Sequence, residues 1–336
     1  MGAVDVEIRP VSGDATGPGE RLFLAWADVY VASGRHAFGP AHSSWSAQER
    51  RELLRSTERQ RLAWAAVAGE VVLGAATLAM PLHDNLEVAD LDVAVHPDRR
   101  RQGVGSLLLA TVESTATRAG RSTLLAETQW PIGRDDEGGA FAASHGYAAA
   151  QTVLRSTLAL PVDRERLQGV LAADGAAGYR LQTCWDGVPQ EWLEGRAELS
   201  RRMSTDVPLG DLRLQEEVWD ADRVRSTYVQ IAAMGRRVVD TFAVHEATGQ
   251  LVGYTQVQVD HGGLAHQQDT LVIRGHRGHG LGLRLKAAST LAVMDELPSV
   301  TGIRTWNAED NLPMLGVNRA LGYEQDAWLR EWQKVV

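Results

Sequence analysis

The sequence predicts an α/β protein made of two domains in tandem. Three observations lead to this fold class: the chain has 336 residues, one motif occurs twice at an offset of 177 residues, and both halves show the same order of predicted strands and helices. A chain of this length exceeds what a single hydrophobic core usually supports. A repeat of about 160 to 175 residues has the size of a domain, whereas the unit of a solenoid is far shorter.

The repeat is clearest where an apolar strand runs into a glycine-rich turn. The matching residues, first copy before second, are Asp92 and Asp269, Val95 and Val272, Arg100 and Arg277, Gly103 and Gly280, and Gly105 and Gly282. A second match follows at an offset of 176, where Gly146-Tyr147 corresponds to Gly322-Tyr323. Glycine and alanine crowd together near residues 161–178, between the copies. We therefore expect an N-terminal domain of residues 1–162 and a C-terminal domain of residues 163–336.

Periodicity and turn residues predict the same elements in each half: a hairpin, a strand, a helix, a strand and a second helix. In the first half they span residues 61–68, 71–79, 87–95, 104–119, 122–127 and 140–145. In the second half they span residues 238–245, 251–260, 266–273, 281–296, 301–306 and 312–321. Asn311 is the natural N-cap of the last helix, and Gly322 is its C′ residue.

Composition excludes several classes of function. The net charge of −9 argues against nucleic acid as the main partner, and it is compatible with a cationic substrate. No apolar run approaches the roughly 18 residues of a membrane span, and the N-terminus carries no secretory leader, so we expect a cytoplasmic protein without a membrane partner. The single cysteine, Cys184, rules out an internal disulfide and a cysteine-based metal site, and we expect no metal. The oligomeric state is left open.

The repeated turn, Arg-x-x-Gly-x-Gly between a strand and a helix, is suited to binding a phosphate. The free N–H groups of the first helical turn point outward, and the helix dipole adds partial positive charge. Glycine lets the backbone approach a pyrophosphate without an intervening Cβ. A dinucleotide-binding turn would need a third glycine, but Gly280-Leu281-Gly282 is followed by Arg284-Leu285. For one copy alone, the alternative is a glycine-rich loop that only changes the direction of the chain. The presence of two copies in register disfavours this alternative.

The two turns resemble the acetyl-CoA signature of GNAT acyltransferases. Val95-His96-Pro97 followed by Arg100-x-x-Gly103-x-Gly105 carries this resemblance, and the segment from Arg277 to Gly282 is its second copy. The segment from Trp306 to Tyr323 resembles the second GNAT motif, in which an asparagine precedes a helix that ends in glycine and an aromatic residue. The tandem arrangement is similar to that of mycothiol synthase and of actinobacterial two-domain GNAT proteins. The stretch from Met203 to Asp211 resembles a recurrent element of the latter group.

The resemblance implies, for each domain, a mixed and mostly antiparallel central sheet flanked by helices. It also implies acetyl-CoA as co-substrate, with its pantetheine arm alongside the strand that precedes the turn. The backbone N–H of Val272 is then the expected oxyanion donor, with Val95 as its counterpart. Asn311 would contact the cofactor, serve only as an N-cap, or do both. The residues expected to bind acetyl-CoA are Val272, Arg277, Gly278, His279, Gly280, Leu281, Gly282, Asn311, Val95, Arg100, Gly103 and Gly105.

Direct attack on the thioester requires a neutral amine, and hence a base beside it. Counting back in twos from Val272 reaches His266, which stands where several family members carry a catalytic glutamate. The alternative is a half-exposed strand histidine without a catalytic role. Asp269 falls on the opposite face by this count and is a second candidate base. Asn318 stands where the family often has a proton-donating tyrosine, although a thiol of pKa about 8.5 can leave as thiolate unaided.

The two halves depart from the family pattern to different degrees. Asp135, Asp136 and Glu137 lie where an anionic cofactor would pass in the first half, and Ala142 matches Asn318. We therefore expect a catalytic second half and a supporting or degenerate first half. The predicted activity is transfer of an acetyl group to a primary amine of a small molecule or peptide. The alternatives are a non-catalytic acyl-CoA-binding regulatory protein and, less favoured, a dinucleotide-dependent enzyme.

Overall fold

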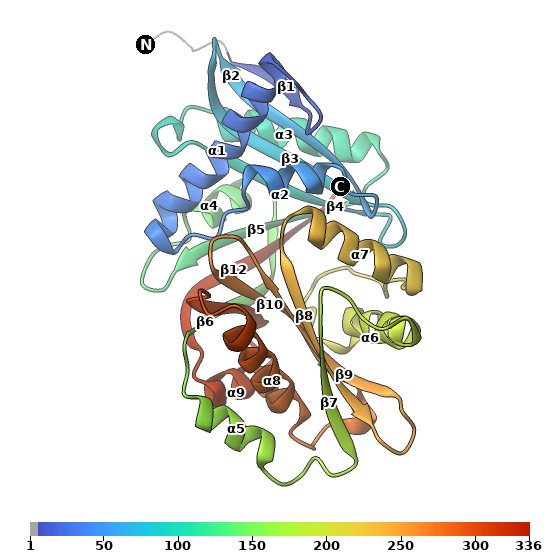
Figure 1. Cartoon of the computed structure of the whole chain (residues 1–336). Coiled ribbons are helices and arrows are strands. Elements are labelled where there is room, and N and C mark those ends of the chain that lie inside the picture. Colours follow the sequence, from blue (N-terminus) through green and yellow to red (C-terminus); the bar gives the residue numbers. More distant parts are fainter. Residues whose placement is uncertain (1–5) are drawn as a thin grey trace. The chain divides into compact units, whose positions relative to one another are not determined.

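A computed structural model describes residues 6–336 and shows two compact units. Unit 1 comprises the chain through Gln151 together with Asp211–Leu214 and Leu329–Val336, and unit 2 comprises Thr152–Gly210 and Gln215–Trp328. The expected boundary between residues 162 and 163 differs from this division. The chain passes between the two units more than once, and its last strand begins in unit 2 and ends in unit 1. The two units are described separately below (Figure 1).

Unit 1 has a mixed, mostly antiparallel sheet in the order β1-β2-β3-β4-β5-β12. Only β4 and β5 pair in parallel among the strand pairs whose register is described here. The elements are β1 (Glu7–Val11), α1 (Pro18–Phe38), η1 (Gly39–Ala41), α2 (Ala47–Leu54), β2 (Arg59–Ala68), β3 (Val71–Pro81), β4 (Val88–Val95), η2 (Pro97–Arg99), α3 (Val104–Arg118), β5 (Thr123–Pro131), α4 (Glu137–Ser144), the start of β6 (Ala148–Ala159) and the end of β12 (Glu324–Val335).

Unit 2 repeats this architecture, with the order β6-β11-β10-β9-β8-β7. Here β10 and β11 form the parallel pair. The elements are the rest of β6, α5 (Arg164–Ala172), β7 (Tyr179–Trp185), η3 (Gln190–Trp192), α6 (Leu193–Asp206), α7 (Ala221–Ala233), β8 (Arg237–His245), β9 (Leu251–Val259), β10 (Leu264–Val272), η4 (Arg274–His276), α8 (Leu281–Glu296), β11 (Gly302–Ala308), α9 (Leu312–Leu321) and the start of β12. The predicted fold class is confirmed.

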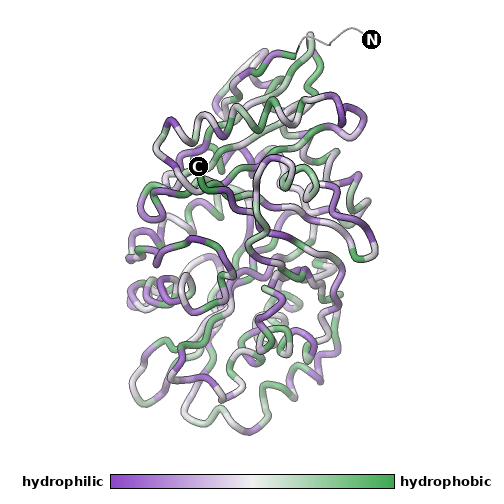
Figure 2. The backbone as a smooth tube through the Cα atoms, turned by 180° about the vertical axis from the view of Figure 1, so that it is seen from behind, coloured by the Kyte–Doolittle hydropathy of each residue, from purple (hydrophilic) through white to green (hydrophobic). Residues whose placement is uncertain are grey.

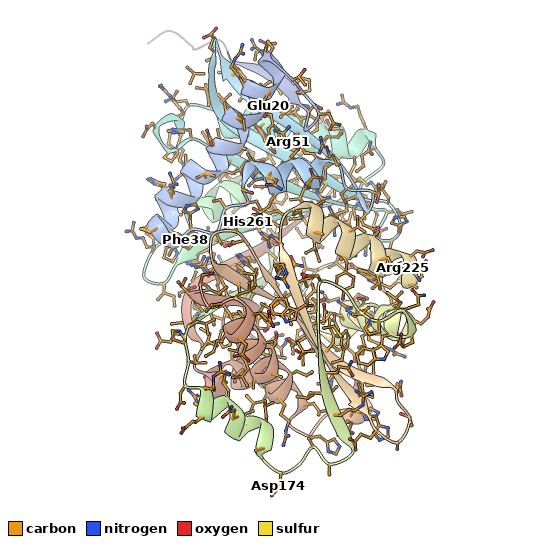
Figure 3. The ribbon with its side chains drawn as sticks, in the orientation of Figure 1. Glu20, Phe38, Arg51, Asp174, Arg225 and His261 are labelled. Carbon is orange, nitrogen blue, oxygen red and sulfur yellow. The ribbon has the colours of Figure 1, made fainter. Side chains whose placement is uncertain are left out.

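Each sheet is covered by helices on both faces. In unit 1, Phe23 and Trp26 of α1 pack on one face, and Leu108 and Val112 of α3 pack on the other. Hydrophobic and hydrophilic stretches alternate along the backbone (Figure 2). On the α1 side, Arg51 of α2 donates to both carboxylate oxygens of Glu20, at 2.8 and 3.0 Å, and so joins α2 to α1 (Figure 3).

The same two-faced packing orients unit 2. Leu281 and Leu285 of α8 pack against Val252 and Val272, whereas Leu199 of α6 packs with Leu271. We call these two sides of the sheet the α8 face and the α6 face. Leu271 and Val272, which are neighbours on β10, therefore lie on opposite faces of the sheet.

Candidate functional site

The glycine-rich turn of unit 2 joins β10 to α8. Gly280 is the N-cap of α8 and has a left-handed φ of 67°, and no side chain caps the helix. Gly278, at φ 88°, has open space where a Cβ would stand. The first N–H groups of α8 thus lack a side-chain cap, and the glycines leave the approach to the turn clear. This arrangement suits a phosphate group.

Arg277 of this turn is held by the chain itself. Its Nε donates to the carbonyl of Val272 at 2.9 Å, and its Nη2 lies 3.1 Å from the Asp206 carboxylate. Arg274 pairs with the other oxygen of Asp206 at 3.2 Å. Asp206 is the last residue of α6 and lies in the recurrent stretch noted in the sequence. The structure therefore gives that stretch a contact with the turn, which its residues alone did not indicate.

An aromatic and histidine cluster supports the other side of the turn. The hydroxyl of Tyr179 lies 2.8 Å from Nδ1 of His276, and its ring lies 5.2 Å from that of His279. Burial, His245 and His279 together lower the pKa of His276. His279 lies on the turn between η4 and α8, and its binding of acetyl-CoA stays a prediction.

The parallel strands β10 and β11 separate just before the turn. Their register pairs only Leu264 with Gly302, Ala265 with Ile303 and His266 with Arg304. Beyond this point β10 continues to pair with β9 as far as Val272, and β11 continues to pair with β6 as far as Ala308. The ends of β10 and β11 thus diverge beside the N-terminus of α8. An extended ligand arm could add to the β10 edge here as a further strand does.

A bulge in β10 corrects the predicted facing of its side chains. The register shifts between Gln267 and Thr270, so that β10 has one residue more than β9 in this interval. Counting in twos across a bulge reverses the faces. His266 is in step with Leu271 of the α6 face, whereas Val272 packs on the α8 face. The expectation that His266 shares the face of Val272 is wrong for this reason.

Asp269 and His266 therefore lie on the same face. Tyr254, which packs on the α6 face, donates its hydroxyl to Asp269 at 2.6 Å. His266 is buried, stacks on Trp306 with 9° between the rings, and lies 3.4 Å from the Asp260 carboxylate. Burial raises the pKa of Asp260, but the hydrogen bond from His266 and backbone N–H groups outweigh it and lower the pKa overall.

Polar residues that the sequence reasoning missed extend this face. Asp240 is fully buried and accepts hydrogen bonds from Tyr228 at 2.9 Å and from Gln256 at 3.1 Å. Arg196 of α6 lies 3.6 Å from Asp240 and stacks 3.9 Å from the Tyr254 ring. Burial raises the pKa of Asp240, opposed by the charge of Arg196. A periodicity argument gives no signal for this network, because its members come from four separate elements.

Asn311 caps α9 as predicted, accepting at Oδ1 from the N–H of Met314 at 3.4 Å. Gly322 at φ 90° ends that helix in the left-handed conformation, also as predicted. Leu281 is a buried first residue of α8, and Gly282 has Val317 as its nearest neighbour at 4.0 Å from an ideal Cβ. These residues frame the N-terminus of α8.

The turn of unit 1, like that of unit 2, has a left-handed glycine at the helix N-cap, but different side chains surround it. Gly103 caps α3 at φ 82°, and Arg100 lies 3.5 Å from the carbonyl of Val95. The other end of the Arg100 guanidinium is paired with Glu137 at 3.0 Å. An ideal Cβ on Gly105 would meet the Phe141 ring at 3.4 Å.

The acidic loop of unit 1 is partly engaged in structure. Asp136 caps α4, accepting from the N–H of Gly139 at 2.7 Å. It also accepts from Thr128 at 2.9 Å. The loop therefore places carboxylates at the start of α4, where unit 2 has the neutral Asn311 at the start of α9.

Unit 1 also carries Glu127 and Glu331, two carboxylates that the sequence reasoning did not single out, near Asp92 of the repeat. The pairing of β4 with β5 ends at Leu91 and Ala126, so Asp92 and Glu127 come next where the two strands diverge. Burial and the nearby carboxylates raise the pKa of Glu127 to about 7, although solvent still reaches the side chain. The pKa of Glu331 is raised to about 6, mainly by burial. Arg50 lies 3.7 Å from Asp92.

Residues 6–336 contain neither a metal-binding group of side chains nor a helix suited to a membrane. No group of three or more His, Cys, Asp or Glu side chains in this range is arranged to hold a metal ion. No helix within it is both long and apolar enough to cross a membrane.

Comparisons with known proteins agree with this architecture. The acetyltransferase (GNAT) family model matches residues 26–130. A tandem GNAT protein from the clavulanic acid biosynthesis pathway, solved without acetyl-CoA, is 31% identical, with a TM-score of 0.82 over 98% of each chain. A GCN5-related N-acetyltransferase from Sphaerobacter thermophilus is 18% identical, with a TM-score of 0.66 over 98% of this chain and 95% of that one. No curated protein matches the chain. The chain belongs to the GNAT acyltransferase superfamily, as one of its tandem two-unit members.

Proposed function

We propose that this protein is an N-acetyltransferase that moves the acetyl group of acetyl-CoA to a primary amine, and that unit 2 carries the main activity. The observation that supports this most is the divergence of β10 and β11 beside the uncapped N-terminus of α8. The turn N–H groups and Arg277 would hold the cofactor phosphates, and the edge of β10 would accept the pantetheine arm. The residues present fit this cofactor, because Gly278 and Gly280 leave the approach open.

Acetyl-CoA supplies an activated acyl group, and the residues of this chain orient it and accept a proton. The Val272 N–H is the proposed oxyanion donor. The amine would approach from the α6 face, where His266 and Asp269 both lie. Either side chain can act as the base that maintains a neutral amine for direct attack. The acceptor class, a small molecule or a peptide, follows from the family alone.

A second acyl-transfer site in unit 1 is the other candidate. The family model matches within this unit, and β4 diverges from β5 beside Asp92 and Glu127. Against it, α4 of unit 1 begins at the acidic residues Asp136 and Glu137, where α9 of unit 2 begins at the neutral Asn311. Like charges near the cofactor phosphates would weaken binding, which is why we assign unit 1 the supporting role.

Calorimetric titration with acetyl-CoA and a screen of amine acceptors test the proposal together. Binding of acetyl-CoA followed by release of free CoA thiol in the presence of an amine is the expected result. Binding without turnover on any amine class would favour the regulatory alternative. Binding of a nicotinamide dinucleotide in place of acetyl-CoA would contradict the proposal outright.

A further inference from the structure

Lys286 is a buried lysine in a protein whose basic side chains are nearly all arginines. The sequence holds only two lysines, Lys286 and Lys334, against 32 arginines. Lys286 lies on α8 and is 1% exposed. At the matching position of the first half stands Leu109, which belongs to an apolar cluster. Arginine stays charged in proteins, whereas a buried lysine can lose its proton, so this choice of residue is chemically distinct.

Two asparagines connect Lys286 to β11. The ammonium donates to Oδ1 of Asn318 at 2.6 Å, and Nδ2 of Asn318 donates to Oδ1 of Asn307 at 2.7 Å. A protonated lysine has donors only, so its charge fixes which end of each amide accepts. The Asn307 oxygen is thereby occupied, and its NH₂ group is left to donate. Within residues 6–336, that NH₂ group has no hydrogen-bond partner.

Asn307 lies on the strand that borders the divergence of β10 and β11. It is half-buried and comes three residues after Arg304, the last residue of β11 that pairs with β10. Continuing that register, with the extra residue of the bulge, places Asn307 across from Thr270. Its side chain faces α9, where it meets Asn318. In the first half, Ala142 occupies the position of Asn318, so this chain of polar groups is specific to unit 2.

We propose that Lys286, Asn318 and Asn307 form a positioning chain that presents an amide N–H of Asn307 to the sulfur of acyl-CoA. This inference rests on the proposed function of unit 2. When the tetrahedral intermediate collapses, the carbon–sulfur bond breaks and sulfur leaves with the electron pair as a thiolate. The Asn307 N–H donates a hydrogen bond to that thiolate, and no proton leaves the chain. The amine proton goes to the base, and solvent later protonates CoA.

The charge of Lys286 gives this chain a dependence on pH. Burial lowers the pKa of Lys286 to about 7, and a titratable group that faces it is Tyr323, between α9 and β12, whose ring lies 4.9 Å from Nζ. Below that pH the lysine is charged and the amides are ordered. Above that pH the neutral amine of Lys286 can also accept a hydrogen bond, so it no longer fixes the orientation of the Asn318 and Asn307 amides. The negative charge that develops on the thiolate favours the charged lysine and so opposes the loss of its proton.

The test measures the pKa of the CoA thiol when CoA is bound to the full-length protein. The ultraviolet absorbance of the thiolate is followed as the pH is raised. We expect the thiol pKa of CoA in unit 2 to be about one unit below its ordinary value near 8.5, since a charge-assisted hydrogen bond favours the thiolate about tenfold. Lys286→Met and Asn307→Ala should both restore the ordinary value. Lys334→Met, at an ion pair with Glu113, should behave as wild type. Because Asn307 is only half-buried, Asn307→Ala should fold, and it provides the test if Lys286→Met does not fold.

The possible outcomes separate this inference from the proposed function. CoA that binds with an unshifted thiol in wild type, or a shift that survives in Asn307→Ala, would overturn the positioning chain alone. Failure of CoA to bind would overturn the proposed function, and this inference with it. Any CoA bound in unit 1 should titrate as an ordinary thiol, because Leu109 and Ala142 replace the polar chain there.

Discussion

At the scale of single residues, the chemistry of unit 2 depends on side chains whose surroundings the sequence does not reveal. Lys286 and Asn318 are 32 positions apart, and nothing in the pattern of either helix pairs them. Asn311 and Gly322 were predictable because capping residues act on their own helix. Residues with local roles can thus be predicted from sequence, and residues whose partners lie on other elements cannot.

Lys286→Met should change how stability depends on pH. The unfolded chain holds the lysine proton up to about pH 10.5, whereas the folded protein releases it near pH 7. Wild type should therefore gain stability relative to Lys286→Met as pH rises from 7 to 10, by up to about 1.4 kcal/mol per pH unit. Urea unfolding at several pH values measures this, with Lys334→Met as the matched loss of a lysine. Parallel stability curves for wild type and Lys286→Met would contradict the assignment of a buried, titrating lysine.

Replacement of the candidate bases should distinguish their roles. His266→Ala and Asp269→Asn each remove one candidate base. The variant that lacks the true base should lose turnover by about 100- to 10,000-fold, since this is the usual contribution of general base catalysis. Acetyl-CoA affinity should stay near that of wild type, because neither residue belongs to the glycine turn. Steady-state kinetics on each variant, with an acceptor from the amine screen, checks this. If both variants keep near-normal turnover, solvent deprotonates the amine.

At the scale of elements, the sequence did not predict correctly which face of the sheet the side chains of β10 occupy. The alternation from Val272 back to His266 assumed a regular strand, and one extra residue between Gln267 and Thr270 reversed it. No residue in Gln267–Thr270 marks a bulge by itself, because glycine and proline are absent there. The hairpins and helices were predictable since their turns and caps carry glycine or asparagine, as at Gly249 and Gly280.

The glycine turn can be tested against an equally strained glycine elsewhere in unit 2. Gly280 has φ 67° at the turn, and Gly249 has φ 70° in the exposed β8–β9 hairpin. Valine at either position costs about 1 to 2 kcal/mol or more, because a left-handed conformation brings its Cβ too close to the carbonyl. Gly280→Val should abolish acetyl-CoA binding to unit 2, and Gly249→Val should leave it intact. Calorimetry on both folded variants gives the comparison, and equal losses would show that strain alone explains the effect.

At the scale of the whole molecule, the internal repeat predicted two similar units, and the structure contains them. The sequence did not reveal that Leu329–Val336 belong to unit 1, since the last strand has the same pattern whichever sheet it joins. Sequence alone also missed the carboxylates of unit 1. Glu127 and Glu331 come close only through the neighbouring strands β5 and β12.

The unequal roles of the two units are the central claim, and one measurement tests them most directly. Acetyl-CoA binding and amine-dependent turnover should be measured side by side for Gly103→Val and Gly280→Val, after circular dichroism shows that both are folded. We predict that Gly280→Val abolishes turnover and that Gly103→Val retains most of it, because unit 2 offers a neutral Asn311 where unit 1 has an acidic loop. Turnover lost in Gly103→Val and kept in Gly280→Val would contradict the account.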